Sequence, residues 1–577
     1  MPLPSPAASL ICGLLLGPPK VIPRRQLRSG LLGPVRSRSM TRPLRRRMAW
    51  LFLAVSGLSL VVAWMLASPV GASPDEQAHI EYSWGTVTGQ TIVGEHLTTI
   101  PPGRTATSVQ VPQKLLQYPP PGCYAFHSER PVAQCSPNPA DNMQTVTQST
   151  YMSRYPPLFY AVEGVVLRAG TAVDLSGPRV LYGARLVAAI LSLLTVGSGV
   201  FLLSRRFPGH VVALSTLLAL PATMWFLAAS VNPNGLEIAA AFLLAAGVLA
   251  LRVDHATGTR SVTAVMAIPI GTLLLAWTRP VSWIWAGLIL GLLLVPTGQK
   301  DGTSWRQRLP VRRLGPLATT ATVLLLTSAM VWFVYALQIR ATDPARLNVG
   351  GWHGLNPIGR VLLLVLHSGT IVSEQVGMFG WLDTPLPPLA VLAWVSITGV
   401  AAAIWAVGRN KIVPQWSVGA VLGLGYLAAL LDEYSGAWGW QGRYLLPVTA
   451  AVCVLAVPGL TKGLEKLSAL RSLIPWTMVA LMAVNALSVV WFLWRNVYGV
   501  KAGPGRLPSA PGPVGTPSWT PPLGQGVVLA LVVLGLACGV AAVWTLGTDA
   551  RVRSSAPRTD PEETLGEPQT VGLPRAR

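Results

Sequence analysis

Two carboxylates and an imidazole lie close together in residues 73–79, directly after the first long apolar run. Asp75 and His79 are four residues apart, and Glu76 and His79 are three apart, so a helix would place all three side chains on one face. A carboxylate in such a group can take the proton of an attacking hydroxyl, and the three side chains together could hold a divalent metal ion. The residue types therefore indicate a catalytic or metal-binding group.

A helix start explains the same residues without any chemistry. Ser73 suits the N-cap position, Pro74 the first helical position, and Glu76 completes the Ser-x-x-Glu pattern of a capping box. Acidic residues also favour a helix N-terminus because of the helix dipole. The spacing alone leaves capping and chemistry open.

The composition identifies a membrane protein. The chain has 577 residues, of which 51% are hydrophobic and 11% charged, whereas soluble proteins carry about 25% charged residues. The mean hydropathy is +0.49. The net charge of +22 comes from Lys and Arg in short stretches between apolar runs and in the tails, as cytoplasmic loops require. The Lys and Arg residues do not gather in a basic soluble domain, so we expect no nucleic-acid partner.

Charge distribution predicts the topology of the first part of the chain. Residues 1–47 read as a basic, disordered cytoplasmic tail, and the true start could be Met1, Met40 or Met48. The first span follows at 48–70, so residues 71–178 form a loop-rich exoplasmic segment ending in an interfacial helix over about 154–166. In this segment Cys123 and Cys135 are candidates for a disulfide, because the compartment is oxidising.

The rest of the chain predicts an all-α polytopic membrane protein of about twelve spans with both termini cytoplasmic. Residues 340–385 form a second large exoplasmic loop, and 547–577 a cytoplasmic tail. The predicted spans are 48–70, 179–203, 209–230, 234–251, 262–278, 280–297, 315–339, 386–408, 413–431, 443–460, 472–494 and 525–546.

Further polar residues gather on the predicted outer side. Arg443 could hold a phosphate through its guanidinium fork, or snorkel to the membrane interface. Trp381 could stack on a sugar or belong to the aromatic belt. Arg279, at a helix break, is either a boundary charge or a phosphate contact. The outward site excludes soluble cytoplasmic nucleotides as donors. Its remaining members are Arg154, Asp383, Gln441 and Tyr444.

Several motifs lie along the chain at and between the predicted spans. They are Pro74-Asp75-Glu76-x-x-His79, Tyr155-Pro156-Pro157-Leu158-Phe159-Tyr160, Arg185-Leu186, Asn232-x-Asn234, Phe379-Gly380-Trp381-Leu382-Asp383 and Gln441-Gly442-Arg443-Tyr444-Leu445-Leu446-Pro447. Together they resemble a bacterial family of predicted membrane proteins, domain of unknown function 2142, over residues 48–500. More distantly the chain resembles the GT-C class of membrane glycosyltransferases, although its tail after 546 holds no sizeable soluble domain.

The GT-C resemblance implies roles for these residues. Asp75, or Glu76 beside it, would be the base that activates the acceptor hydroxyl, and His79 would orient that carboxylate or help bind substrate. Arg443 would contact the lipid-linked phosphate, assisted by Arg154 or Arg185. Gln441 and Trp381 would be second-rank substrate contacts, and Asp383 and Tyr444 are further substrate-binding candidates. Some related enzymes need Mg²⁺ or Mn²⁺ at the acidic pair and others do not, so a metal at Asp75, Glu76 and His79 stays open.

The sequence thus predicts a plasma-membrane glycosyltransferase. It would move a sugar from a polyprenyl-phosphate carrier to a cell-envelope glycan or protein on the exoplasmic face. The alternatives are a transporter or flippase of a lipid-linked glycan and a non-catalytic envelope-assembly protein. A transporter needs charged residues deep within its spans, whereas the charges here cluster at the outer ends.

Overall fold

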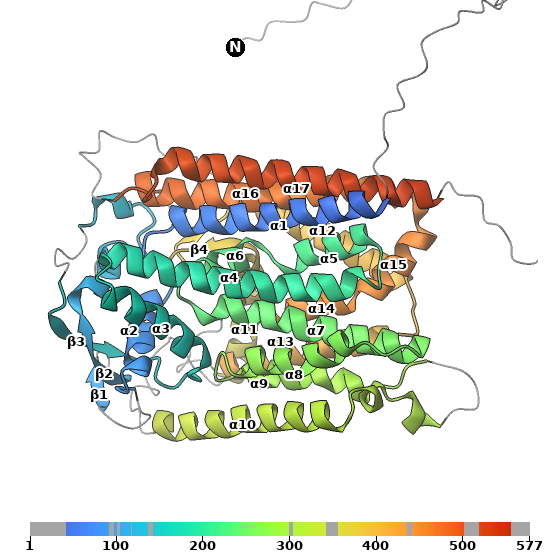
Figure 1. Ribbon diagram of the computed structural model, residues 1–577, viewed down its shortest axis with the longest axis horizontal. Helices are drawn as coiled ribbons and strands as arrows, with labels where there is room; N and C mark the ends of the chain where they lie inside the picture. The colour runs from blue at the N-terminus through green and yellow to red at the C-terminus, as the bar shows by residue number, and fades with distance from the viewer. Residues whose placement is uncertain are drawn as a thin grey trace, which may run out of the picture. The chain divides into compact units, whose positions relative to one another are not determined.

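Long apolar helices form most of the described chain (Figure 1). The computed structural model describes residues 42–91, 97–100, 104–116, 118–136, 142–298, 304–341, 356–434, 441–500 and 519–554. Within these ranges, seven helices are long and apolar enough to cross a membrane. They lie in α1 (Arg42–Ala67), α4 (Gly177–Ser204), α7 (Pro233–Thr257), α10 (Pro316–Ala341), α12 (Pro388–Val407), α16 (Ile474–Tyr498) and α17 (Gly524–Ser554).

Two further apolar segments are bent pairs of helices. The pair α5 (Gly209–Ala219) and α6 (Ala222–Ala228) bends by 72°, and the pair α14 (Leu446–Leu455) and α15 (Val457–Lys466) bends by 47°. Pro221 and Pro458 lie at these breaks, where a proline removes a backbone donor. Three shorter apolar helices complete the set: α8 (Val262–Ala276), α9 (Ser282–Gly291) and α13 (Gln415–Tyr434).

Each of the twelve predicted spans coincides with one of these helices or pairs. Length and composition support seven spans, or nine when each bent pair counts as one. The all-α, multi-pass membrane architecture is therefore confirmed, whereas the number twelve stays a prediction. Of the predicted tails, residues 1–41 and 555–577 lie outside the described residues, and 42–47 and 547–554 continue α1 and α17.

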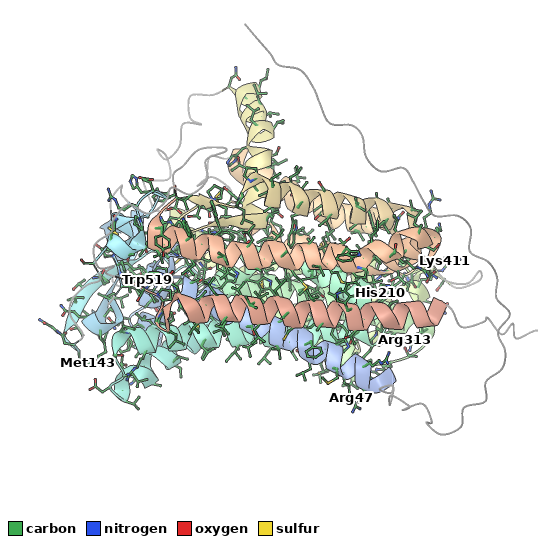
Figure 2. All side chains as sticks on the ribbon, turned by 90° about the horizontal axis from the view of Figure 1, so that it is seen from above. Arg47, Met143, His210, Arg313, Lys411 and Trp519 are labelled. Carbon is green, nitrogen blue, oxygen red and sulfur yellow. A yellow bond between two sulfur atoms is a disulfide. The ribbon has the colours of Figure 1, made fainter. Side chains whose placement is uncertain are left out.

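The two ends of the helices differ in character. Figure 2 shows Arg47, Arg313 and Lys411 at one end and Met143 at the other. All three basic residues belong to segments that the charge pattern predicts to share one side of the membrane. We call the opposite end, which carries the strands, the sheet end.

The segment after α1 contains a small sheet. It comprises α2 (Glu76–Val87), β1 (Leu97–Ile100), β2 (Arg104–Pro112), β3 (Thr145–Thr150) and α3 (Leu158–Ala172). The strands pair in the order β1-β2-β3, both pairs antiparallel. The expectation of a loop-rich segment was wrong here, because β2 buries Val109 and Val111 toward α2 and α3. Cys123 and Cys135, the candidate pair, are joined by a disulfide.

The predicted loop 340–385 also contains a helix. Asn356 is the N-cap of α11 (Pro357–Gly377), and its side chain accepts a hydrogen bond from the Gly359 amide. The helix leads into the hairpin of β4 (Met378–Phe379) and β5 (Thr384–Pro385). The apolar stretch in this helix is shorter than a span requires, so hydropathy alone missed it.

Candidate functional site

The site is organised around the first turn of α2. The helix begins at Glu76, and Asp75 precedes it in the left-handed conformation with φ 64°, which few non-glycine residues adopt. Of the two interpretations left open, the capping box does not form: Ser73 is not the N-cap, and its hydroxyl bonds the Ser230 hydroxyl at 3.0 Å. Asn232 Nδ2 donates to the Pro74 carbonyl at 3.0 Å. These contacts connect the turn to the segment between α6 and α7.

Glu76 points away from solvent and is fully buried. Arg185 of α4 donates to it through Nε at 2.7 Å and Nη2 at 2.6 Å. The backbone amides of Gly71 and Val231 donate to the same carboxylate at 2.8 and 3.0 Å. Arg185 also donates to the carbonyls of Met65, Ser68 and Pro69 at the end of α1. This buried pair joins α1, α2, α4 and the segment before α7, and both partners are saturated.

Asp75 points the other way, toward a more open space, and its side chain is 26% exposed. Tyr151 donates to Oδ1 at 2.7 Å and Arg443 Nη2 donates to Oδ2 at 3.1 Å. Burial raises the pKa of the Asp75 carboxyl, but Arg443, His79 and the Tyr151 hydrogen bond outweigh it, so the net pKa lies below its ordinary value. Asp75 is therefore a carboxylate at neutral pH.

His79 lies one turn further along α2, beside Asp75. Its Nδ1 shares a hydrogen bond with the Tyr160 hydroxyl of α3 at 2.9 Å. Burial lowers the pKa of His79 to about 3; the Asp75 carboxylate acts against this, while Arg443 and Arg279 add to it. His79 is therefore neutral at physiological pH.

Two buried guanidinium groups flank the ring of Tyr444. Arg279 lies 4.3 Å from the ring centroid and Arg443 lies 5.2 Å from it. Arg279 is anchored by Glu237 of α7, whose carboxylate also accepts from Ser282. Buried donors still lack partners among the described residues: Nε of Arg279, and Nε and Nη1 of Arg443. Unsatisfied buried charged donors are costly, so this geometry favours an anionic ligand.

The position of Arg443 depends on α11. Arg443 belongs to the short 3-10 turn η8 (Gly442–Tyr444), and the Gly442 amide donates to Glu374 Oε2 of α11 at 2.5 Å. A side chain at Gly442 would lie 2.2 Å from the Ile371 carbonyl, so glycine is required there. The Gln-Gly-Arg-Tyr motif thus combines a close backbone approach with a buried cation.

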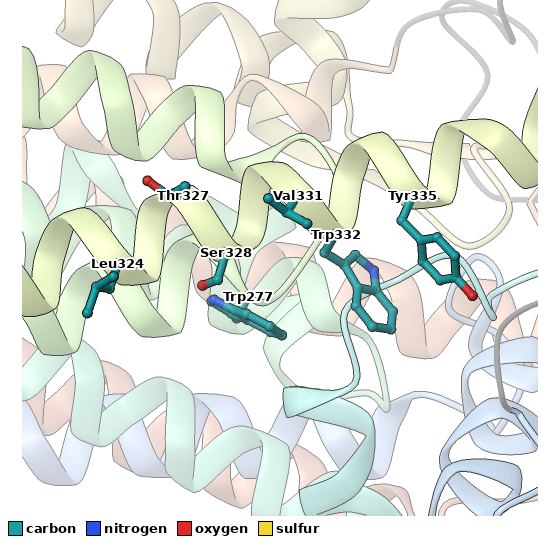
Figure 3. A pocket seen from close by; sticks show the side chains of 7 residues that line it. All are labelled: Trp277, Leu324, Thr327, Ser328, Val331, Trp332 and Tyr335. Carbon is teal, nitrogen blue, oxygen red and sulfur yellow. The ribbon is translucent and has the colours of Figure 1, made fainter.

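An apolar groove lies beside the polar residues (Figure 3). It has a volume of about 550 Å³, and Trp277, Leu324, Thr327, Ser328, Val331, Trp332 and Tyr335 line it. Trp332 Nε1 donates to the Arg154 carbonyl at 3.1 Å, and the next residue, Tyr155, lies under the Arg279 guanidinium with its ring centroid 5.8 Å away. Trp277 is two residues before Arg279. The groove and the cationic site are therefore adjacent.

The structure brings only some of the predicted site residues together. Asp75, His79, Arg443 and Tyr444 lie together, whereas Glu76 and Arg185 form the saturated pair described above. Asp383 pairs with Arg495 of α16 at 2.8 Å, and Trp381 Nε1 donates to the Gly71 carbonyl at 3.1 Å. Gln441 precedes η8, and its buried Oε1 lacks a partner among the described residues.

Sequence reasoning missed several members of the site. Tyr151 is an ordinary residue of a polar segment, and Glu237 lies in an apolar run with no local sign of its role. Tyr160 belongs to the motif at residues 155–160, but no role was assigned to it. Arg279 had a signal, an arginine followed by proline at a helix break, but its distance from Arg443 in sequence concealed their proximity. Among the described residues, no cluster of three or more His, Cys, Asp or Glu side chains could hold a metal ion.

Fold and site define a multi-pass membrane protein in which a partly exposed carboxylate, Asp75, lies beside two buried guanidinium groups at the sheet end. The family model for predicted membrane proteins, DUF2142, matches residues 58–452, and the chain belongs to this family. A search of curated proteins finds no match.

The solved structures that match this chain include ArnT and an oligosaccharyltransferase. ArnT from Cupriavidus metallidurans bound to undecaprenyl phosphate is 16% identical, with a TM-score of 0.37, covering 89% of this chain and 81% of that chain. The apo oligosaccharyltransferase from Archaeoglobus fulgidus is 10% identical, with a TM-score of 0.41, covering 78% of this chain and 56% of that chain. The second match thus spans slightly more than half of the oligosaccharyltransferase. Both TM-scores lie below 0.5, so neither establishes a shared fold.

Proposed function

We propose that this protein is a membrane glycosyltransferase that takes a sugar from a polyprenyl-phosphate carrier. The observation that carries the proposal is the pairing of a partly exposed carboxylate, Asp75, with two buried guanidinium groups that have unpartnered donors. A base next to a phosphate-binding pair of cations is the arrangement that sugar transfer from a phosphate ester requires.

The reaction can be written with this chain's own residues. The acceptor hydroxyl oxygen attacks the anomeric carbon while the bond from that carbon to the phosphate oxygen breaks. The phosphate leaves on its lipid with the electron pair, and Arg443 and Arg279 stabilise the charge that develops on it. The hydroxyl proton passes to Asp75 and then to water. Neutral His79, held by Tyr160, keeps the carboxylate oriented.

The groove beside Arg279 supports a lipid-borne donor. A ligand with an anionic head and a long apolar chain would place its head at Arg279 and Arg443 and its chain against Trp277, Trp332 and Tyr335. We place the sheet end on the exoplasmic side, because the basic residues gather at the other end. The acceptor is a cell-envelope glycan or protein that reaches the site from outside.

The side of the membrane on which unused donor lipid accumulates distinguishes a transferase from a flippase. In a deletion host, loss of a transferase leaves sugar-loaded polyprenyl phosphate accumulating on the outer face, where a membrane-impermeant oxidant modifies it. Loss of a flippase leaves the same lipid on the inner face, protected from that oxidant. Outer-face accumulation reversed by the wild-type chain supports the proposal. Inner-face accumulation contradicts it, and an unchanged lipid pool contradicts both activities.

A further inference from the structure

Arg443 already uses one of its nitrogens to bind Asp75. Nη2 donates to Asp75 Oδ2 at 3.1 Å and to the Tyr444 hydroxyl at 3.3 Å. The other two nitrogens, Nε and Nη1, are buried and lack partners among the described residues. Among the described residues, only Nη2 of this guanidinium is hydrogen-bonded.

The geometry of a guanidinium restricts how a phosphate can use these donors. Two of its edges can bind two oxygens at once, one through Nε and Nη2 and the other through Nη1 and Nη2, because the third edge carries the side-chain carbon. Nη2 belongs to both edges. Each N–H of Nη2 has an acceptor in this structure, since Asp75 and Tyr444 are both bonded to it. A phosphate bound in the bidentate manner must therefore displace one of them.

We propose that the donor's phosphate competes with Asp75 for Arg443, so that Asp75 is released to act as base only when the donor is bound. This inference rests on the proposed function. Tyr151 retains Oδ1 and keeps the carboxylate in place after Oδ2 loses Arg443. Arg279, anchored on Glu237, offers its unpartnered Nε to the same phosphate.

Release changes the chemistry of Asp75 in the useful direction. While it is bound to Arg443, its pKa lies below the ordinary value, which makes it a weak base. A phosphate that takes Arg443 removes this stabilisation and adds negative charge nearby, and both effects strengthen the base. The charged and titratable groups that act on Asp75 or His79 are Arg443, Arg279, Tyr151, Tyr155 and Tyr160. Because Asp75 is a weak base until the donor binds, premature deprotonation of water or of an acceptor is reduced.

The test is the affinity of the purified full-length chain for farnesyl phosphate in detergent, measured by titration calorimetry. Asp75→Asn removes the competing charge and suits the left-handed conformation. We expect it to bind about tenfold more tightly than the wild type, the scale of about 1.4 kcal/mol. The matched control is Asp174→Asn, which removes an exposed carboxylate paired with Lys114 and leaves the affinity unchanged. Unchanged or weaker binding by folded Asp75→Asn overturns the competition.

A second arm separates failure of this inference from failure of the proposed function. Arg443→Gln is expected to weaken farnesyl phosphate binding by about tenfold or more. If it has no effect, the donor site itself is wrong. If Arg443→Gln weakens binding but Asp75→Asn does not tighten it, the donor site stands and the competition fails. Inorganic phosphate serves as a competitor: displacement at concentrations similar to farnesyl phosphate shows a site for free phosphate and contradicts the lipid donor.

An infrared measurement tests release without relying on affinity. Farnesyl phosphate added to the wild-type chain is expected to shift a carboxylate stretching band in the difference spectrum, and the shift is expected to vanish in Asp75→Asn. An unshifted spectrum at saturating farnesyl phosphate contradicts the release of Asp75.

Discussion

Asp75 and Glu76 are adjacent carboxylates, each paired with an arginine, yet the two pairs differ in every physical respect. Glu76 accepts hydrogen bonds from Arg185 and from two backbone amides. Arg185 also donates to three backbone carbonyls, and neither side chain is exposed. Asp75 is 26% exposed, and two nitrogens of its partner Arg443 lack a hydrogen-bond partner within the described part of the chain. The difference teaches that saturation distinguishes a structural ion pair from one that is poised for a ligand.

Glu76→Gln is expected to have the largest effect, on folding. It would leave Arg185 buried without its charge partner, which costs about 3–5 kcal/mol of unfolding free energy. The measurement is the thermal unfolding midpoint in detergent together with the amount of protein in the membrane. Glu465→Gln, which breaks an exposed pair with Lys462, should change neither. A stable Glu76→Gln protein would show that the saturated pair is not structural.

Arg443→Gln is expected to leave the fold intact and lower sugar transfer by about 10²–10³-fold, because a donor to the leaving phosphate is lost. Transfer would be measured as envelope glycan formed per folded protein in the deletion host. The matched control is Arg168→Gln, which removes an exposed guanidinium of α3 bonded to the Val87 carbonyl. Equal activity of the two variants would remove Arg443 from the site.

Asn232→Ala should have an intermediate effect on both properties. It removes two interactions: the hydrogen bond from Asn232 to the Pro74 carbonyl, and the N-cap that the Asn232 side chain provides for α7. We expect a loss of about 1–2 kcal/mol in stability. Since Asp75 follows Pro74, transfer should fall as well. Asn356→Ala, which removes the N-cap of α11, should lower stability slightly and leave Asp75 in position. Equal transfer in both variants would show that Asn232 does not position Asp75.

The smallest expected effect concerns pH. The pKa of His79 is lowered from 6.5 to about 3, so this imidazole is uncharged throughout the range in which a free histidine titrates. Protonation, with its cost, begins only as the pH falls toward 3. The transfer rate in isolated membranes should therefore show no change attributable to histidine around pH 6.5. If the transfer rate does change near pH 6.5, and this change disappears in His79→Gln, then His79 carries charge during turnover.

Local spacing predicted part of this site well. The i, i+4 relation of Asp75 and His79 holds, and each predicted span falls on an apolar helix or a bent pair, because both properties depend on neighbours in the sequence. Local spacing did not separate Asp75 from Glu76. Their roles depend on Arg185 and Arg443, which are 109 and 368 residues away from their partners, and on a left-handed backbone at Asp75.

Other features depend on tertiary contacts for the same reason. The strands β1–β3 are short and partly polar, so their pairing is specified by packing against α2 and α3 rather than by a strong pattern. Arg279 becomes a site residue only because Glu237 of α7 and the ring of Tyr444 hold it beside Arg443. A helix break with an arginine marks such a position without identifying its partner.

The most direct test compares Asp75→Asn with Glu76→Gln in the same deletion host, scoring envelope glycan against the amount of folded protein in the membrane. We expect Asp75→Asn to give a normal protein level with glycan reduced by about 10²–10⁴-fold. We expect Glu76→Gln to lower the protein level itself. A normal glycan yield per folded Asp75→Asn protein would contradict the catalytic role of Asp75 and the transferase with it.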